Sequence, residues 1–254
     1  MSPLKNRFFD SKIVLNLTTI VTVVVIWYFV AQANFFPAIF LPTPKATFGS
    51  LWALIVSGKF FHALLISSLR IIGATILAVI IGAVVGVLMG MSKKIEALLM
   101  PITQPIRYLP ITALLPLFIL WFGIGEAMKV MFLFVGIVFY FIPLVANAIR
   151  TTPLEYIEVA RGLGATENQI MKKVYWPHAL PQILDGLIVI NGIGWTYVIL
   201  AEIVNARNGL GYLINIAGRL QRSDEVFAGL ILIALVAVAS DKMLRFIKDK
   251  YFFW

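Results

Sequence analysis

The sequence predicts an all-α polytopic membrane protein with about six transmembrane helices and, outside them, a pair of short amphipathic helices. Of the 254 residues, 61% are hydrophobic, and the mean hydropathy is +0.94. These values are typical of a multi-spanning membrane protein rather than of a soluble domain with an apolar core. No separate soluble domain fits this composition, so we expect residues 1–254 to form a single transmembrane domain.

Six apolar segments are long enough to cross a bilayer, which takes roughly 20 helical residues. They lie at about 13–33, 66–91, 95–122, 127–148, 178–201 and 226–247. Four prolines interrupt the third segment: Pro101, Pro105, Pro110 and Pro116. Because proline breaks or kinks a helix, we expect only the part near 111–122 to lie deep in the membrane. The second segment contains three glycines spaced for close helix packing: Gly82, Gly86 and Gly90.

The first apolar segment also has features of a signal peptide. Lys5, Arg7 and Lys12 precede it, and Ala31-Gln32-Ala33 ends it. Its apolar run of about 20 residues is long for the hydrophobic region of a signal peptide and matches the length of a span. We therefore expect this segment to be a retained transmembrane helix.

The orientation in the membrane follows from the basic residues. With the N-terminus in the cytoplasm, 14 of the 21 lysines and arginines fall on that side, Arg107 among them. The positive-inside rule favours this orientation, which places both termini and the polar segment 152–177 in the cytoplasm. Because the basic residues are scattered along the membrane edges, we do not expect the chain to bind nucleic acid.

The sequence lacks the patterns of common catalytic and metal sites. It has no cysteine, which excludes thiolate metal sites and cysteine nucleophiles, and its two histidines, His62 and His178, are far apart. There is no G-x-x-x-x-G-K-[ST] pattern, so the chain does not bind ATP through a P-loop of its own. We expect no catalytic residue, no metal site and no cofactor on this chain.

The polar segment 152–177 predicts two short helices. Capping-box patterns at Thr152 and Thr166 mark their starts, and Gly162 and Gly164 separate them. Each helix has an apolar face: Tyr156, Val159, Ala160 and Leu163 on the first, and Ile170, Met171, Val174 and Tyr175 on the second. Such a pair is suited either to rest on lipid headgroups or to dock onto a soluble partner, and geometry alone leaves both possibilities open.

Part of this segment closely resembles a motif of known transport proteins. Glu158-Val159-Ala160, three residues, Gly164, nine residues and then Val174-Tyr175-Trp176-Pro177 resembles the E-A-A, x3, G, x9, I-x-L-P motif. That motif belongs to the permease subunits of bacterial binding-protein-dependent ABC importers. Three apolar replacements depart from it: Val159, Val174 and Trp176. Residues 121–126 and 201–212 are similar to the nitrate, sulfonate, taurine and bicarbonate branch.

The resemblance implies a multi-pass subunit of the bacterial plasma membrane that works with other chains. Its implied partners are two ATPase subunits that hold ATP and Mg²⁺, a second permease copy, and a periplasmic or lipid-anchored solute-binding protein. The short helices would be coupling helices that fit a groove of each ATPase. The implied coupling residues are Glu158, Val159, Ala160, Arg161, Gly162, Gly164, Ile170, Val174 and Pro177.

The fifth segment carries the candidate residues of the solute pathway: Asp185, Asn191, Trp195 and Thr196. A charge in the bilayer centre is costly, so we expect Asp185 to lie near the cytoplasmic edge or to pair with a neighbouring helix. Asn191 and Trp195 are one helical turn apart. They either line the channel near the axis of a permease dimer or pack between helices.

Three charged residues are expected at the outer surface. Glu202 and Arg207 follow the fifth segment, so we place them at the periplasmic mouth, either as a surface ion pair or as a contact for the binding protein. Arg70 lies near the start of the second segment, where we expect it to anchor that helix at the membrane interface.

The sequence therefore predicts the transmembrane subunit of an ABC importer for a small anionic solute. One alternative is an ABC permease for a neutral or aromatic solute such as a vitamin precursor. An ion-driven secondary transporter is disfavoured because neither internal repeats nor buried ion-coupling charges are visible in the sequence. A membrane-embedded enzyme is disfavoured by the lack of a polar catalytic cluster.

Overall fold

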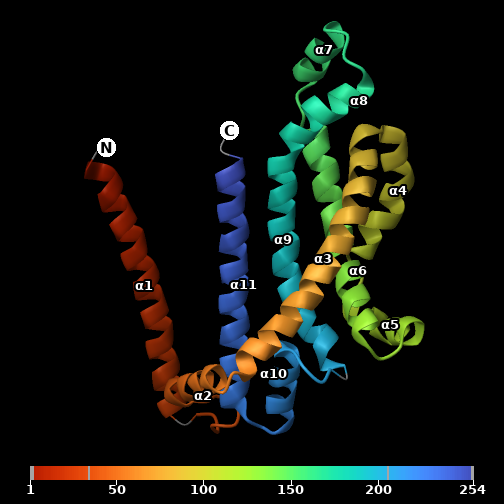
Figure 1. The fold of residues 1–254 in the computed structure, drawn as a ribbon. Helices are drawn as coiled ribbons and strands as arrows, with labels where there is room; N and C mark the ends of the chain where they lie inside the picture. The colour runs from red at the N-terminus through yellow and green to blue at the C-terminus, as the bar shows by residue number, and fades with distance from the viewer. Residues whose placement is uncertain (1–2, 34, 205, 253–254) are drawn as a thin grey trace. The chain divides into compact units, whose positions relative to one another are not determined.

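The computed structural model describes residues 3–33, 35–204 and 206–252, and most of them are helical (Figure 1). Five helices or helical runs in this part of the chain are long and apolar enough to cross a membrane. They are α1 (Pro3–Gln32, apolar from Val14), α3 (Lys59–Met91), α6 (Glu126–Arg150), the run Glu167–Ile203 that ends in α9 (Trp176–Ile203), and α11 (Ser223–Tyr251).

The remaining span is the broken one that the prolines predict. It consists of α4 (Lys93–Ile106), the 3₁₀ turn η1 (Ile111–Leu114) and α5 (Leu115–Phe122), and the two halves meet at 90°. Pro101 and Pro105 lie inside α4, Pro110 directly precedes η1, and Pro116 lies in the first turn of α5. Counting this pair as one span gives six, which confirms the predicted fold class.

The chain forms two compact units, of which one comprises Met1–Phe61 and Leu213–Leu232. Within this unit, α1 leads to α2 (Pro44–Val56), whose N-terminus is capped by the Thr43 side chain. The indole Nε1 of Trp27 in α1 donates to the carbonyl of Pro42 at 2.9 Å, and the Trp27 ring stacks on Phe227 with 5.9 Å between centroids. These contacts join α1, the segment before α2 and the start of α11.

The second unit comprises His62–Tyr212 and Ile233–Trp254, and α6 is its most deeply buried span. The spaced glycines of α3 lie against α6. A Cβ on Gly86 would approach Val145 Cβ to 2.6 Å, and a Cβ on Gly90 would approach Ile149 Cβ to 2.7 Å. The predicted close packing is therefore confirmed, because only a glycine leaves room for the α6 backbone and side chains at this distance.

Within this unit α6 and α9 run side by side, and the connection between them lies at the end where α6 finishes and α9 begins (Figure 1). That connection contains α7 (Leu154–Gly162), α8 (Glu167–Ile170) and the π-helical turn η2 (Met171–Tyr175). At the opposite end, Glu126 of α6 follows the α5–α6 turn, and Ile203 of α9 leads to the connection before α10 (Leu210–Arg219). The fold thus separates two polar regions by the length of a membrane span.

Candidate functional site

The segment that resembles the coupling motif forms two helices with a tight turn between them, as predicted. The second capping box is confirmed: Thr166 N donates to the Gln169 side chain at 2.8 Å, and the Thr166 side chain accepts from Gln169 N. The first is wrong, because Pro153 occupies the N-cap of α7 without a side-chain bond and Thr152 is buried. Packing against the rest of the chain removes Thr152 from the capping position.

The turn between α7 and α8 depends on Gly164. Its φ is +81°, a conformation that non-glycine residues rarely adopt. Gly164 N donates to the Arg161 carbonyl at 2.9 Å, and Ala165 N donates to the Ala160 carbonyl at 3.0 Å. This pair of bonds is the Schellman motif, which satisfies the last carbonyls of α7 and fixes the direction of the chain.

Helix α7 exposes several apolar side chains. Leu163 is 83% exposed, and three other apolar side chains of the helix are exposed as well: Leu154, Tyr156 and Val159. Ile157 faces inward and is buried. Among the predicted coupling residues, Glu158, Arg161, Gly162, Gly164 and Pro177 are also exposed, whereas Ala160 and Val174 are half-buried. We refer to the four apolar side chains Leu154, Tyr156, Val159 and Leu163 as the α7 patch.

Ile170 differs from the other predicted coupling residues because it is fully buried. It therefore anchors α8 to this chain and presents no surface to a partner. The sequence also predicted a second helix separate from the fifth span, and this is wrong: α8 continues through the π turn η2 directly into α9. No loop therefore separates α8 from the fifth span.

The segment 152–177 carries an ion pair across the turn between α7 and α8. Arg161 pairs with Glu167 at 3.1 Å instead of with Glu158, which stays exposed. The hydrogen bond from Arg161 to Glu167 raises the pKa of the Arg161 guanidinium. Glu158 thus retains a free carboxylate on the same exposed helix as the α7 patch.

The predicted pathway residues of α9 mostly bond to α11. The Asp185 carboxylate accepts from Lys248 Nζ at 2.6 Å, which confirms the predicted pairing with a neighbouring helix. Asn191 Nδ2 and Trp195 Nε1 both donate to Ser240 Oγ, at 2.9 and 3.0 Å. Trp195 is buried, while Thr196 is exposed and bonds to the Gly192 carbonyl. Of the four, only Thr196 lies on the open face of α9.

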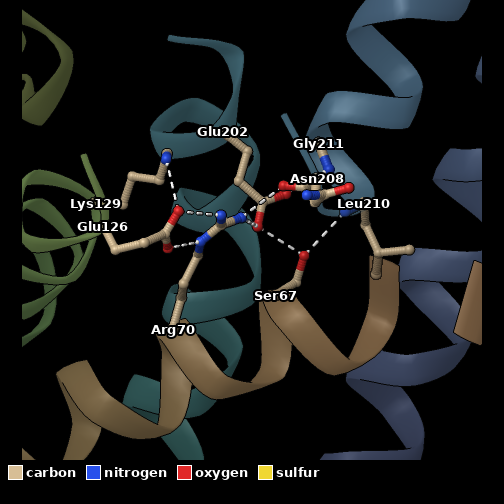
Figure 2. Close-up of polar contacts among 8 residues, drawn as sticks. All are labelled: Ser67, Arg70, Glu126, Lys129, Glu202, Asn208, Leu210 and Gly211. Atoms are coloured by element: carbon tan, nitrogen blue, oxygen red, sulfur yellow. Dashed lines mark hydrogen bonds and ion pairs between the residues drawn. The ribbon is translucent and has the colours of Figure 1, made fainter. Parts of the chain in front are cut away.

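At the other end of α6 and α9 lies a charge network that the sequence analysis missed (Figure 2). Its centre is Glu202, whose carboxylate is fully buried and accepts from Arg70 Nη1 at 2.6 Å and from Ser67 Oγ at 2.7 Å. Arg70 also forms a two-bond pair with Glu126, each bond 2.6 Å long. Lys129, likewise buried, donates to Glu126 at 2.9 Å.

Two expectations are corrected by this network. Glu202 is not part of a surface pair with Arg207; it is buried, whereas Arg207 is exposed. Arg70 does not anchor its helix at the interface, because its side chain points into the network and is only 5% exposed. Buried charges are therefore present, contrary to the sequence-based view, and those of the network are paired with one another. The available signal was the presence of Arg70 inside the second apolar segment and of Glu202 directly after the fifth.

The network also fixes the connection between α9 and α10. Gly211 N donates to the second oxygen of Glu202 at 2.7 Å, and Leu210 N donates to Ser67 Oγ at 2.9 Å (Figure 2). Gly209 has φ +125°, and a Cβ there would overlap the Glu202 carboxylate. The connection therefore needs glycine both for its backbone conformation and for the space that Glu202 occupies.

Several apolar spans, an exposed helical tip and a largely buried charge network are together typical of a membrane transport component. Over the described ranges no group of three or more His, Asp or Glu side chains is arranged to hold a metal ion. Residues 78–251 match the family described as the inner membrane component of binding-protein-dependent transport systems, and the chain belongs to this family. It is therefore a permease subunit of an ABC importer, a non-catalytic component of the transport system.

Curated relatives cover nearly the whole chain. The taurine transport system permease protein TauC of Escherichia coli K12 is 32% identical over 96% of this chain and 90% of its own length. The aliphatic sulfonates transport permease protein SsuC of Bacillus subtilis 168 is 35% identical over 91% and 84%. The riboflavin transport system permease protein RibX of Chloroflexus aurantiacus is 32% identical over 87% and 82%.

Solved structures share the fold. The inward-facing MetNI methionine ABC transporter matches with a TM-score of 0.66 and 20% identity over 77% of this chain and 95% of that chain. An amino acid ABC transporter matches with a TM-score of 0.59 and 20% identity, over 79% and 96%. At these identities the likeness concerns the fold alone.

Proposed function

We propose that this chain forms the translocation pathway for a small anionic solute and that α7 and α8 couple the pathway to ATP hydrolysis on a separate ATPase. The observation that carries this proposal is the α7 patch, four exposed apolar side chains held at the tip of the unit by the Gly164 turn. Exposed apolar groups of this kind on a rigid helix are typical of helix-in-groove docking.

The continuity of α8, η2 and α9 supports a mechanism for coupling. Closure of two ATPase subunits on ATP would move the α7 patch and, with it, α8. Because the Ile170 side chain of α8 is buried in this chain, α8 would move together with the residues that pack around it. The motion would enter the fifth span through η2. ATP and Mg²⁺ are held by the ATPase, and a solute-binding protein delivers the solute on the opposite side.

The pathway in this proposal forms between two permease copies in the bacterial inner membrane. Thr196 is exposed on the open face of α9, so we assign it to the pathway. Asn191 and Trp195 then support that face through their bonds to Ser240, and Asp185 supports it through Lys248. The basic residues favour cytoplasmic termini, with the α7 patch on the cytoplasmic side.

The anionic solute class is supported by the relatives named for taurine and for aliphatic sulfonates. A second candidate, a neutral or aromatic solute, is favoured by the relative named for riboflavin, which is as similar in identity as the taurine relative. The two classes differ in charge, so transport by the complete complex separates them.

The test of coupling is made on the permease, its ATPase and its binding protein reconstituted in liposomes. Leu163→Asp and Gly164→Val should reduce co-purification of the ATPase, or reduce ATP hydrolysis stimulated by the binding protein, at least tenfold. Phe246→Asp, at an exposed apolar residue of α11, is the matched control and should retain ATPase association. Normal assembly and normal stimulation of ATP hydrolysis in both variants would contradict the proposal and would indicate that the α7 patch contacts lipid.

A further inference from the structure

Arg107 lies at the break of the third span, outside both the α7 patch and the charge network around Glu202. Arg107 directly follows α4, and its guanidinium carbon lies 5.2 Å from the centroid of the Tyr140 ring. The Tyr140 hydroxyl donates to the carbonyl of Arg107 at 3.1 Å. Both the backbone and the side chain of Arg107 are thus fixed against α6.

The position of Tyr140 gives the depth of Arg107. Tyr140 lies close to the midpoint of α6 (Glu126–Arg150). With a rise of 1.5 Å per residue, it is about 21 Å from Glu126 and about 15 Å from Arg150. The hydrocarbon core of a bilayer is roughly 30 Å thick, so this level is inside it. The orientation count placed Arg107 on the cytoplasmic side, whereas its contact with Tyr140 puts it nearer the middle of α6 than either end of that helix.

Arg107 has no counter-ion within this chain. Among residues 3–33, 35–204 and 206–252, no carboxylate pairs with it, and its buried Nε has no hydrogen-bond partner. The two buried cations of the outer network, Arg70 and Lys129, each contact Glu126. Ionisable residues inside membranes normally pair or line a solute or ion path, so an unpaired one indicates a functional site.

The surroundings of Arg107 combine packed and exposed residues. A Cβ on Gly136 would approach the Tyr197 ring of α9 to 2.7 Å, so Tyr197 packs closely against α6. Tyr108, the next residue after Arg107, is 84% exposed, and Thr196, the residue before Tyr197, is exposed as well. The guanidinium therefore rests on Tyr140 of a packed helix pair, and exposed residues adjoin it in the sequence.

We infer that Arg107 is the residue that binds the anionic group of the solute inside the membrane. This inference rests on the proposed transport of an anionic solute and names the group that recognises it. A guanidinium donates paired N–H bonds to two oxygens of a sulfonate or carboxylate, and the half-buried Arg107 side chain forms no ion pair with the described residues that would occupy its terminal nitrogens. Tyr140 holds the opposite face of the guanidinium through a cation–π contact.

The first test measures taurine uptake by the complete complex of permease, ATPase and binding protein in liposomes. Arg107→Gln should lower uptake at least tenfold, while assembly and ATP hydrolysis stimulated by the binding protein persist. Arg107→Lys should keep part of the uptake because it retains the charge. Arg245→Gln is the matched control, since this exposed arginine of α11 pairs with Asp241 and should transport normally.

The second test uses the absence of cysteine from the chain. Arg107→Cys should be inactive, and a positively charged aminoethyl thiol reagent should restore uptake, whereas a neutral methyl reagent should not. The wild-type complex treated with each reagent controls for cysteines in the partners. Rescue by charge would not occur if Arg107 only packed against Tyr140, so equal loss with both reagents overturns the inference.

The outcomes separate the inference from the proposed function. If the wild-type complex takes up riboflavin and no sulfonate, the anionic class is wrong and the inference fails with it. If the wild type takes up taurine and Arg107→Gln does so equally well, the inference alone is wrong. If Arg107→Gln fails to assemble, two other measurements test the inference. Partial uptake by Arg107→Lys and recovery of uptake by Arg107→Cys with the charged reagent alone would support it, and their absence would overturn it.

Discussion

Arg70 and Arg107 lie in the same compact unit, and both belong to apolar spans, yet their surroundings differ. Arg70 contacts Glu126 and Glu202 at 2.6 Å and also donates to the Asn208 carbonyl at 2.8 Å. Arg107 has the face of Tyr140 and no carboxylate in the described part of the chain. The first arginine is satisfied within the fold, whereas the second keeps its capacity to bind an anion.

The comparison shows that a charge inside a membrane protein has to be interpreted through its partners. A buried ion pair that also accepts backbone N–H bonds is part of the structure, because removing one partner leaves an uncompensated charge. An unpaired guanidinium is costly to the fold, so its presence indicates a role that the fold alone does not supply.

The largest effect on stability is expected from Glu202→Gln. The carboxylate is fully buried and accepts bonds from Arg70, Ser67 and Gly211. Removing its charge leaves Arg70 partly unpaired and should cost about 3–5 kcal/mol of unfolding free energy. The thermal unfolding midpoint of the purified permease in detergent measures this loss. An unchanged midpoint would show that the network contributes nothing to the fold.

Gly209→Ala should have the next largest effect. Its φ of +125° is strained for alanine, and the added Cβ would overlap the Glu202 carboxylate, so the cost should reach about 1–3 kcal/mol. Gly123→Ala is the control, since Gly123 also has a positive φ of +70° but faces open space. The same unfolding measurement should show the smaller shift for Gly123→Ala. Equal shifts would mean that only backbone conformation matters at Gly209.

Glu126→Gln tests the exposed side of the same network. The Glu126 side chain is 62% exposed, so solvent screens part of its interaction with Arg70 and Lys129, but both of these cations are buried. We expect a loss of about 1–3 kcal/mol, smaller than for Glu202→Gln, because Lys129 loses its counter-ion while Arg70 keeps Glu202. In comparison with Glu202→Gln, this result would show that burial sets the strength of the network. A loss as large as that of Glu202→Gln would contradict this view.

Arg107→Gln is expected to leave stability nearly unchanged or slightly higher, because no carboxylate loses a partner. Its effect should appear in solute uptake instead. The opposite pattern is expected for Glu202→Gln, in which the fold is weakened first. Unfolding midpoints for the two variants, measured side by side, are therefore the direct check of the comparison between Arg70 and Arg107.

Much of the fold was predictable because it depends on local patterns. Apolar segments of sufficient length predict spans, prolines predict the break between α4 and α5, and the spaced glycines of α3 predict close packing. The Gly164 turn and the Thr166 capping box are also set by residues a few positions apart. Thr152 shows the limit of such reasoning, because tertiary packing buries it and leaves Pro153 at the N-cap.

Local sequence patterns were sufficient to predict the family, the membrane spans and the two short helices between α6 and α9, since hydropathy and turn chemistry act over short distances along the chain. The pairing of the charges could be established only from the folded chain. Arg70, Glu126 and Glu202 lie on three helices, and Arg107 meets Tyr140 across a 33-residue separation. Whether a charged side chain is paired depends on contacts between residues that are far apart in the sequence, and no pattern of neighbouring residues specifies these contacts.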